Sequence, residues 1–144
     1  MSARITGGTN TNQRSHGFCD RLLGSNCGKR TLAVCPNFLG VGGNWYSGDG
    51  GREFRAAFES AILPRLREFK PALIVISAGF DAHTRDPLAN LNLVEADYTW
   101  VTQKLMQIAD ADAEGRVVSV LEGGYDLEAL AGSAAAHVAA LMRG

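Results

Sequence analysis

The sequence has 144 residues, enough for one domain with a hydrophobic core. Its 14 basic and 15 acidic residues leave a formal charge of -1, which gives no electrostatic reason to expect a nucleic-acid or membrane partner. No apolar run approaches the roughly 18 residues of a membrane span, and residues 1–12 are polar, without the apolar core of a secretion signal. We therefore expect a cytoplasmic protein that binds neither nucleic acid nor membrane.

The first 30 residues differ in composition from the rest of the chain. They are rich in Gly, Asn, Thr, Ser and Arg and have no sustained hydrophobic period, so we expect a divergent loop or a disordered segment at 1–30. The chain has three cysteines, Cys19, Cys27 and Cys35. An odd number without a Cys-x-x-Cys pair favours reduced thiols over a disulfide framework or a zinc knuckle.

Two strands and an intervening helix are predicted next. Residues 31–35 form a short apolar run typical of a strand. A helix should begin at residues 50–51 and end before Pro71, because apolar residues recur at three- and four-residue steps. Pro64 should kink this helix or end its first segment. Residues 73–76 are apolar on both faces, which indicates a central parallel strand.

Two further helices flank a third strand. Asn92 and Glu95, three residues apart, predict a capping box at the start of a helix that Gly115 ends. The apolar face of that helix comprises Tyr98, Val101, Leu105, Ile108 and Ala109. Residues 117–121 form the third strand, and Asp126 can cap the last helix. The apolar face expected for the last helix comprises Leu127, Leu130, Ala134, Val138, Leu141 and Met142.

The alternation of strands and helices predicts one α/β domain, a three-layer parallel sheet with right-handed crossovers. In an open parallel sheet, ligands bind at the carboxyl ends of the strands. The segments that follow the second and third strands, 77–83 and 121–126, are therefore the candidate site.

Asp81 directly follows the second predicted strand. Gly79 permits an unusual backbone before it, and a carboxylate held in this way is a suitable oxygen ligand for a divalent metal. The alternative is a turn or helix-capping carboxylate. His83 is a candidate second metal ligand, and its alternative is an ordinary loop histidine.

Tyr125 follows two glycines after the third strand. Without side chains at Gly123 and Gly124, a substrate can approach the backbone closely. The Tyr125 phenol can then donate a hydrogen bond to an oxyanion, a contribution worth about a hundred- to a thousandfold in rate. The alternative is an aromatic ring that covers the start of the last helix. A carboxylate and a phenol on one edge suit metal-assisted attack on a carbonyl.

The segments 79–82 (Gly-Phe-Asp-Ala) and 123–125 (Gly-Gly-Tyr) resemble the C-terminal portion of the histone deacetylase and acetylpolyamine amidohydrolase superfamily, most closely its bacterial and class II-like members. The resemblance runs from about Asp49 to Gly144 and includes the text from Asn92 to Asp97. It implies a partial arginase/deacetylase-like fold, with residues 31–144 as the C-terminal portion of that domain.

The resemblance also implies roles for the site residues. Asp81 matches a zinc ligand, which His83 can assist only weakly, and Tyr125 matches the catalytic tyrosine that polarises the amide carbonyl. In the complete family, zinc activates water, and the substrates are acetyl-lysine proteins or acetylated small molecules such as acetyl-polyamines.

Further matches concern residues that contact the substrate in the family, and some family motifs have no counterpart in this sequence. Gly123 and Gly124 match the glycine pair before the tyrosine, and Leu88 matches a wall residue of the acyl tunnel. The tandem histidines and the Asp-x-His segment of the family are absent, and the three histidines of the chain stand apart. Of these, His137 falls within the last helix, where we expect a structural role.

We therefore expect a truncated zinc-dependent deacetylase-family protein with little or no activity alone. A non-catalytic α/β binding or assembly module is the alternative, and a generic α/β ligand-binding domain is a third hypothesis. An uncovered sheet edge would also favour self-association.

Overall fold

The computed structural model describes the backbone of residues 31–34 and the whole of residues 48–143. The loop or disorder expected for residues 1–30 and the reduced state expected for the cysteines lie outside the described residues. In the described ranges no helix has the length and apolar character needed to cross a bilayer.

Three parallel strands form the sheet. They are β1 (Thr31–Val34), β2 (Leu73–Ala78) and β3 (Val117–Leu121), in the order β1-β2-β3. The predicted parallel arrangement is confirmed, and β3 spans the predicted residues. Strand β2 continues two residues beyond the predicted end, to Ala78, whose partner in β3 is Leu121.

The first helical segment is interrupted, as Pro64 predicts. Helix α2 (Gly51–Ala57) leads into the π-helical turn η2 (Phe58–Ile62), and α3 (Leu63–Phe69) follows. Proline lacks a backbone N–H and its ring clashes with the carbonyl four residues earlier, so the chain widens into a π-turn before it.

Helix α4 (Glu95–Asp112) does not begin with the predicted capping box. Val94 is the N-cap residue, and its N–H donates to the Asp97 carboxylate at 3.0 Å. The Asn92 side chain is used elsewhere, because its amide donates to the Gly48 carbonyl at 2.9 Å and its oxygen accepts from Thr84. The predicted apolar face of α4 is confirmed, since all five of its residues are buried.

Helix α5 (Leu127–Leu141) begins where predicted but buries a different face. The Asp126 carboxylate caps it by accepting from the Ala129 N–H at 2.8 Å. The predicted apolar face is wrong at Leu127 and Met142, which are 80% and 81% exposed, and also at Val138. The buried residues of the helix are Ala129, Ser133, His137 and Ala140. These mostly small side chains let α5 approach α4 closely, so Leu127, Val138 and Met142 remain exposed, whereas Leu130 and Leu141 are partly buried against the core.

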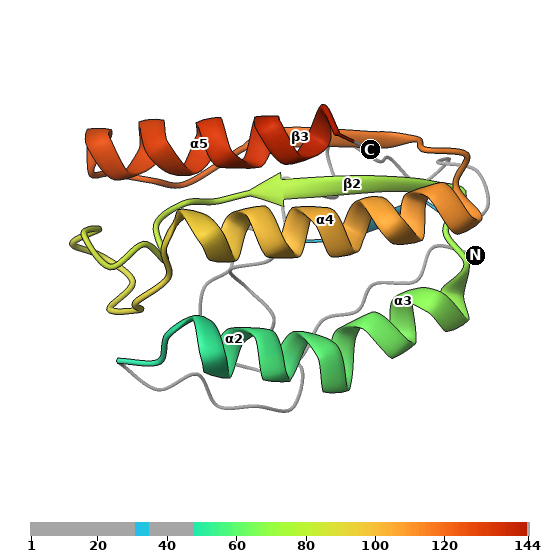
Figure 1. Cartoon of the computed structure of the whole chain (residues 1–144), viewed down its shortest axis with the longest axis horizontal. Helices are drawn as coiled ribbons and strands as arrows, with labels where there is room; N and C mark the ends of the chain where they lie inside the picture. Colours follow the sequence, from blue (N-terminus) through green and yellow to red (C-terminus); the bar gives the residue numbers. More distant parts are fainter. Residues whose placement is uncertain (1–30, 35–47, 144) are drawn as a thin grey trace.

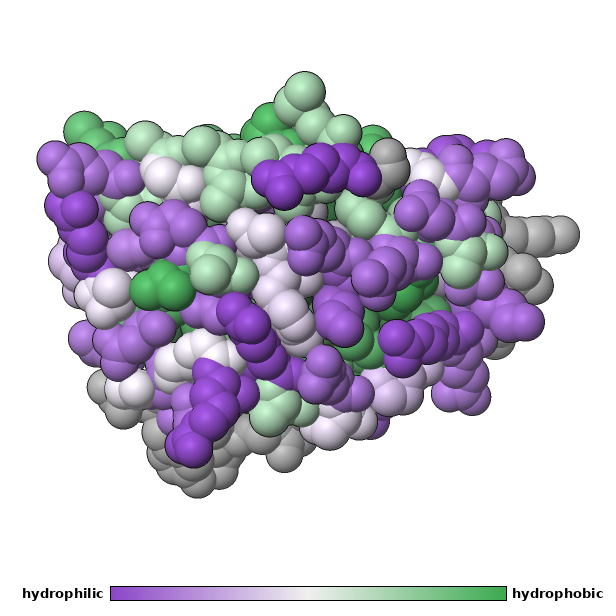
Figure 2. Space-filling model, in the orientation of Figure 1, coloured by the Kyte–Doolittle hydropathy of each residue, from purple (hydrophilic) through white to green (hydrophobic). Residues whose placement is uncertain are grey.

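The described elements form a sheet with helices packed over it. Helices α4 and α5 lie over the strands and α2–α3 runs beside α4, so the described residues supply two of the three expected layers (Figure 1). Phe54, Phe58, Leu66, Ile74 and Leu105 are among the buried core residues between them. On the face shown in Figure 2, purple hydrophilic residues cover much of α4 and α2–α3, whereas the upper rim over α5 is largely pale green.

Candidate active site

The loops after β2 and β3 leave the sheet side by side. Beyond the strands, the Glu122 N–H donates to the Ala78 carbonyl at 3.0 Å, and the Phe80 N–H donates to the Gly123 carbonyl at 2.7 Å. These bonds extend the parallel pairing past both strand ends. Asp81 and Tyr125 therefore lie at the same edge of the sheet, the one formed by the carboxyl ends of the strands, as the order of the strands predicts.

Gly123 makes room for the Asp81 side chain. A Cβ atom on Gly123 would lie 2.7 Å from Asp81 Oδ1 and 2.9 Å from its Cγ, closer than real Cβ atoms come to other atoms. The carboxylate thus rests against the backbone two residues before Tyr125. The sequence indicated a glycine open to substrate, and the structure adds this contact.

Gly124 is needed for its backbone conformation. Its φ is +135°, a region that side chains disfavour, and a Cβ there would lie 3.0 Å from Leu130 Cδ1 and 3.3 Å from Phe80 Cβ. The glycine therefore lets the chain turn sharply over the start of α5 and brings Tyr125 to the rim.

Tyr125 and Leu88 are both exposed at this edge, at 60% and 63%. Their backbones are joined through one side chain, that of Asp86. Its Oδ2 accepts from the Tyr125 N–H at 2.6 Å, and its Oδ1 accepts from the Leu88 N–H at 3.0 Å. The contact with Tyr125 spans 39 positions, so no local sequence pattern indicates it.

His83 faces Glu95. Its ring is buried, and its Nδ1 accepts from the Arg85 N–H at 3.1 Å, so the proton of the neutral ring is assigned to Nε2. Nε2 lies 3.6 Å from Glu95 Oε1 and makes no hydrogen bond within the described part of the chain. A role for His83 beside Asp81 stays a prediction.

A buried phenol lies beneath the same loop. The Tyr98 hydroxyl donates to the Phe80 carbonyl at 3.2 Å. Burial raises the pKa of Tyr98, and the negative charge of Asp81 raises it further. Tyr98 therefore stays protonated, which agrees with the core position predicted from the sequence.

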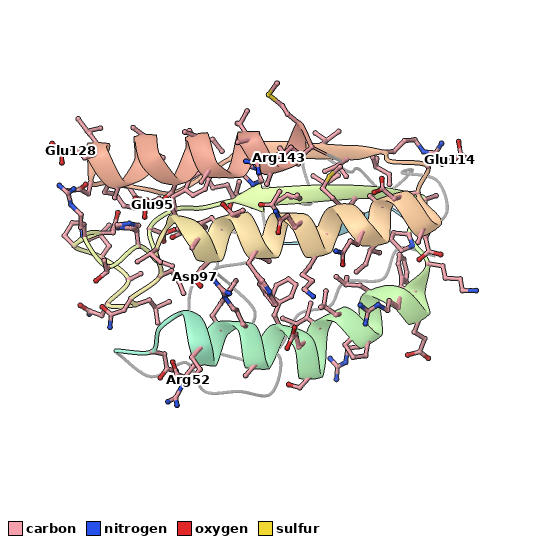
Figure 3. The ribbon with its side chains drawn as sticks, viewed as in Figure 1. Arg52, Glu95, Asp97, Glu114, Glu128 and Arg143 are labelled. Atoms are coloured by element: carbon pink, nitrogen blue, oxygen red, sulfur yellow. The ribbon has the colours of Figure 1, made fainter. Side chains whose placement is uncertain are left out.

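Charged side chains near the candidate site form ion pairs with one another. Arg85 donates to Glu128 at 2.6 Å and lies 3.7 Å from Asp126. The hydrogen bond that Arg85 donates to Glu128 is the main cause of the raised pKa of Arg85. Figure 3 shows Glu95 and Glu128 at the end where α4 and α5 begin, whereas Glu114 lies at the opposite end.

The fold and this edge define a class of protein: a parallel α/β domain that presents a carboxylate and a phenol beyond two adjacent strands. The sequence profile of the histone deacetylase domain matches residues 40–141. The chain therefore belongs to the histone deacetylase family.

Relatives in several organisms share this segment. The chain is 48% identical over 88 residues to type-2 histone deacetylase 1 of Dictyostelium discoideum, 43% over 95 residues to chloroplastic histone deacetylase 14 of Arabidopsis thaliana, and 46% over 86 residues to an uncharacterized protein of Synechocystis. The matches cover 61%, 66% and 60% of this chain but 6%, 22% and 27% of those proteins. The chain thus spans less than a third of these relatives.

Solved structures share the fold. The structure of the histone deacetylase Clr3 matches with a TM-score of 0.63 and 36% identity, over 68% of this chain and 16% of that one. The HD domain of HDA15 matches with a TM-score of 0.62 and 28% identity, over 78% of this chain and 37% of that one. The partial deacetylase-like α/β fold predicted from the sequence is confirmed.

Proposed function

We propose that this chain supplies the carbonyl-polarising side of a deacetylase site that acts on acetyl-lysine or acetyl-polyamine amides. The observation that carries the proposal is the contact of the Asp81 carboxylate with Gly123, two residues before the exposed Tyr125. Membership of the family supports the reaction class.

Tyr125 is the proposed oxyanion donor. Its phenol is exposed at the edge, and its backbone is fixed by the Asp86 carboxylate. A donor that is already oriented needs little reorganisation as negative charge develops on the carbonyl oxygen. Leu88, Gly123 and Gly124 are the proposed contacts for the acyl group and its attached chain.

The described residues do not make a complete zinc site. They contain no group of three or more His, Cys, Asp or Glu side chains that could hold a metal ion, whereas catalytic zinc takes three protein ligands. Asp81 is the proposed ligand for the zinc of the family, and the remaining ligands have to come from other residues.

The test is reconstitution of the reaction. The full chain with zinc is assayed on an acetyl-lysine peptide, alone and with a separate family fragment that carries the tandem histidines and the Asp-x-His segment. We expect near-background hydrolysis alone and clear turnover with the fragment. Asp81→Asn and Tyr125→Phe should each lower that turnover by about a hundredfold or more.

The matched control is Asp110→Asn, an exposed carboxylate near the other end of α4, which should keep the activity. Turnover by the chain alone that depends on Asp81 and Tyr125 would contradict the incomplete site. Absence of turnover with the fragment would contradict the proposed function.

A second candidate is the non-catalytic assembly module, with self-association through the sheet edge. The supporting observation is that Val118 and Leu121 of β3 are exposed, and that β3 pairs on only one side within the described residues. An exposed apolar strand edge favours pairing with another chain. Light scattering after size exclusion tests this idea, and a monomer across a wide concentration range would contradict it.

The cytoplasmic location stays a prediction.

A further inference from the structure

Asp86 carries a buried carboxylate. Within the described structure, every hydrogen bond that this carboxylate accepts comes from a backbone amide. Asp86 is 8% exposed and lies in the loop after β2. Its Oδ2 accepts from Tyr125 at 2.6 Å and from Asp126 at 3.3 Å, and its Oδ1 accepts from Leu88 at 3.0 Å. The two oxygens therefore hold two loops that follow different strands.

Two of the atoms held are the backbone nitrogens of Leu88 and Tyr125, whose side chains are exposed. Pro87 has no N–H, so Leu88 is the first donor available after Asp86 on its own loop. Tyr125 is the residue that follows Gly124, where the chain turns with positive φ. One rigid, planar carboxylate thus sets the position of both residues relative to each other.

We propose that Asp86 is a positioning residue that fixes the separation between the acyl-contact residue Leu88 and the oxyanion donor Tyr125. This inference rests on the proposed function. Hydrogen bonds to a charged carboxylate are shorter and stronger than those between neutral groups. Reacting groups lose about a hundredfold in rate when they are displaced by about 1 Å, so a carboxylate that fixes both residues influences catalysis without touching the substrate.

Asparagine is an informative replacement. It has nearly the shape of aspartate but presents one acceptor oxygen in place of two. In Asp86→Asn, one of the two loops should therefore keep its hydrogen bond while the other loses it. In Asp86→Ala, both bonds are lost.

The first measurement is amide hydrogen exchange of the full chain, resolved by residue with NMR. We expect the amides of Leu88 and Tyr125 to be protected in the wild type, and to exchange about tenfold faster or more in Asp86→Ala. In Asp86→Asn only one of them should accelerate. Amides of β2 and α4 and the control Asp110→Asn should be unchanged.

The second measurement reports on the phenol itself. With 3-fluorotyrosine in the chain, the fluorine resonance of Tyr125 should shift or broaden in Asp86→Ala, and also in Asp86→Asn when the Tyr125 amide is the one that exchanges faster. The resonance of Tyr98, whose hydroxyl bonds to the Phe80 carbonyl, should not change. Tyr125→Phe assigns the line, and it should leave the exchange of the Leu88 amide as in the wild type.

The outcomes separate the two proposals. Unprotected amides at Leu88 and Tyr125 in the wild type, or exchange and fluorine lines that Asp86→Asn leaves unchanged, overturn the positioning role. In the reconstituted assay, Asp86→Asn should lower kcat more than it changes KM, with no further loss in a Tyr125→Phe background. Unchanged kcat overturns the role. If the assay shows no turnover at all, the proposed function fails, and the exchange and fluorine measurements still decide whether Asp86 holds the two residues.

Discussion

Glycine at position 123 lets the Asp81 carboxylate lie against the backbone that leads to Tyr125. The Asp81 carboxylate occupies the space that a Cβ on Gly123 would need, at 2.7 Å from Oδ1. Any larger residue at position 123 therefore has to displace Asp81 or the loop that precedes Tyr125. The glycine is required by this contact and also leaves the backbone open at the edge.

Gly123→Ala should destabilise the fold and move Asp81. We expect a loss of about 1–3 kcal/mol in the free energy of unfolding, because an atom is forced into a filled space. Chemical denaturation measures it. Asp81→Ala removes the obstructing carboxylate, so in its background Gly123→Ala should cost much less. If Gly123→Ala lowers the free energy of unfolding equally in both backgrounds, the contact between Asp81 and Gly123 is contradicted.

Residues that follow strands could be predicted from the sequence, whereas contacts between distant loops could not. Asp81 and Tyr125 were placed on one edge because each comes after an apolar strand-length run. Asp86 acts through Tyr125, 39 positions away, and His83, in the loop after β2, faces Glu95 at the start of α4. No local pattern encodes such partners, since they depend on how the loops fold back on each other.

At the scale of elements, His137 joins α5 to α4 and β3. Its Nδ1 lies 2.7 Å from Thr102 Oγ1, and its Nε2 lies 2.8 Å from Ser119 Oγ. Thr102 donates its hydroxyl proton to the Tyr98 carbonyl at 2.7 Å, so it accepts from Nδ1–H of the neutral imidazole. The structural role expected for His137 agrees with this network, which links three elements.

The free energy of unfolding should fall when the solution becomes mildly acidic. Burial lowers the pKa of His137 below its ordinary value, so the unfolded chain binds more protons than the folded chain as the pH drops through about 6.5. Denaturation between pH 8 and pH 5 measures the slope. His137→Gln, which keeps hydrogen-bonding groups but does not titrate, should have a shallower slope. Identical slopes would rule out this contribution.

Elements in which large apolar residues recur regularly were predicted correctly from the sequence, whereas the buried face of α5 was not. β3 and the buried face of α4 follow from runs and spacings of large apolar residues. Helix α5 instead packs through alanine, serine and histidine. Gly132 shows how close the contact is, because a Cβ there would lie 2.9 Å from Glu95 Oε1. Hydrophobicity alone cannot predict a face that is selected for small size.

At the scale of the whole molecule, the described chain is a part of the family domain that carries one side of the proposed site. It matches the histone deacetylase profile over residues 40–141 but spans less than a third of the relatives compared. Strands β2 and β3 both lie within the matched segment, and their ends carry the candidate site. We expect the remaining groups of a working centre to be supplied from outside this segment.

Zinc binding by the chain alone should be weak. Asp81 is the proposed ligand, and the described residues offer no cluster of three ligating side chains. Calorimetric titration at neutral pH should show no saturation in the sub-micromolar range. Tight one-to-one binding that disappears in Asp81→Ala, but persists in Asp110→Asn, would show that the chain holds a complete site.

A double-mutant cycle tests the central claim most directly, namely that Asp81 and Tyr125 serve one reaction site. Its measurement is kcat/KM for the acetyl-lysine peptide in the reconstituted assay, for Asp81→Asn, Tyr125→Phe and the double variant. Groups that act as a unit give grossly non-additive losses, so the double variant should be about as slow as the slower single variant. Losses that multiply, or wild-type turnover in either single variant, would contradict a shared site.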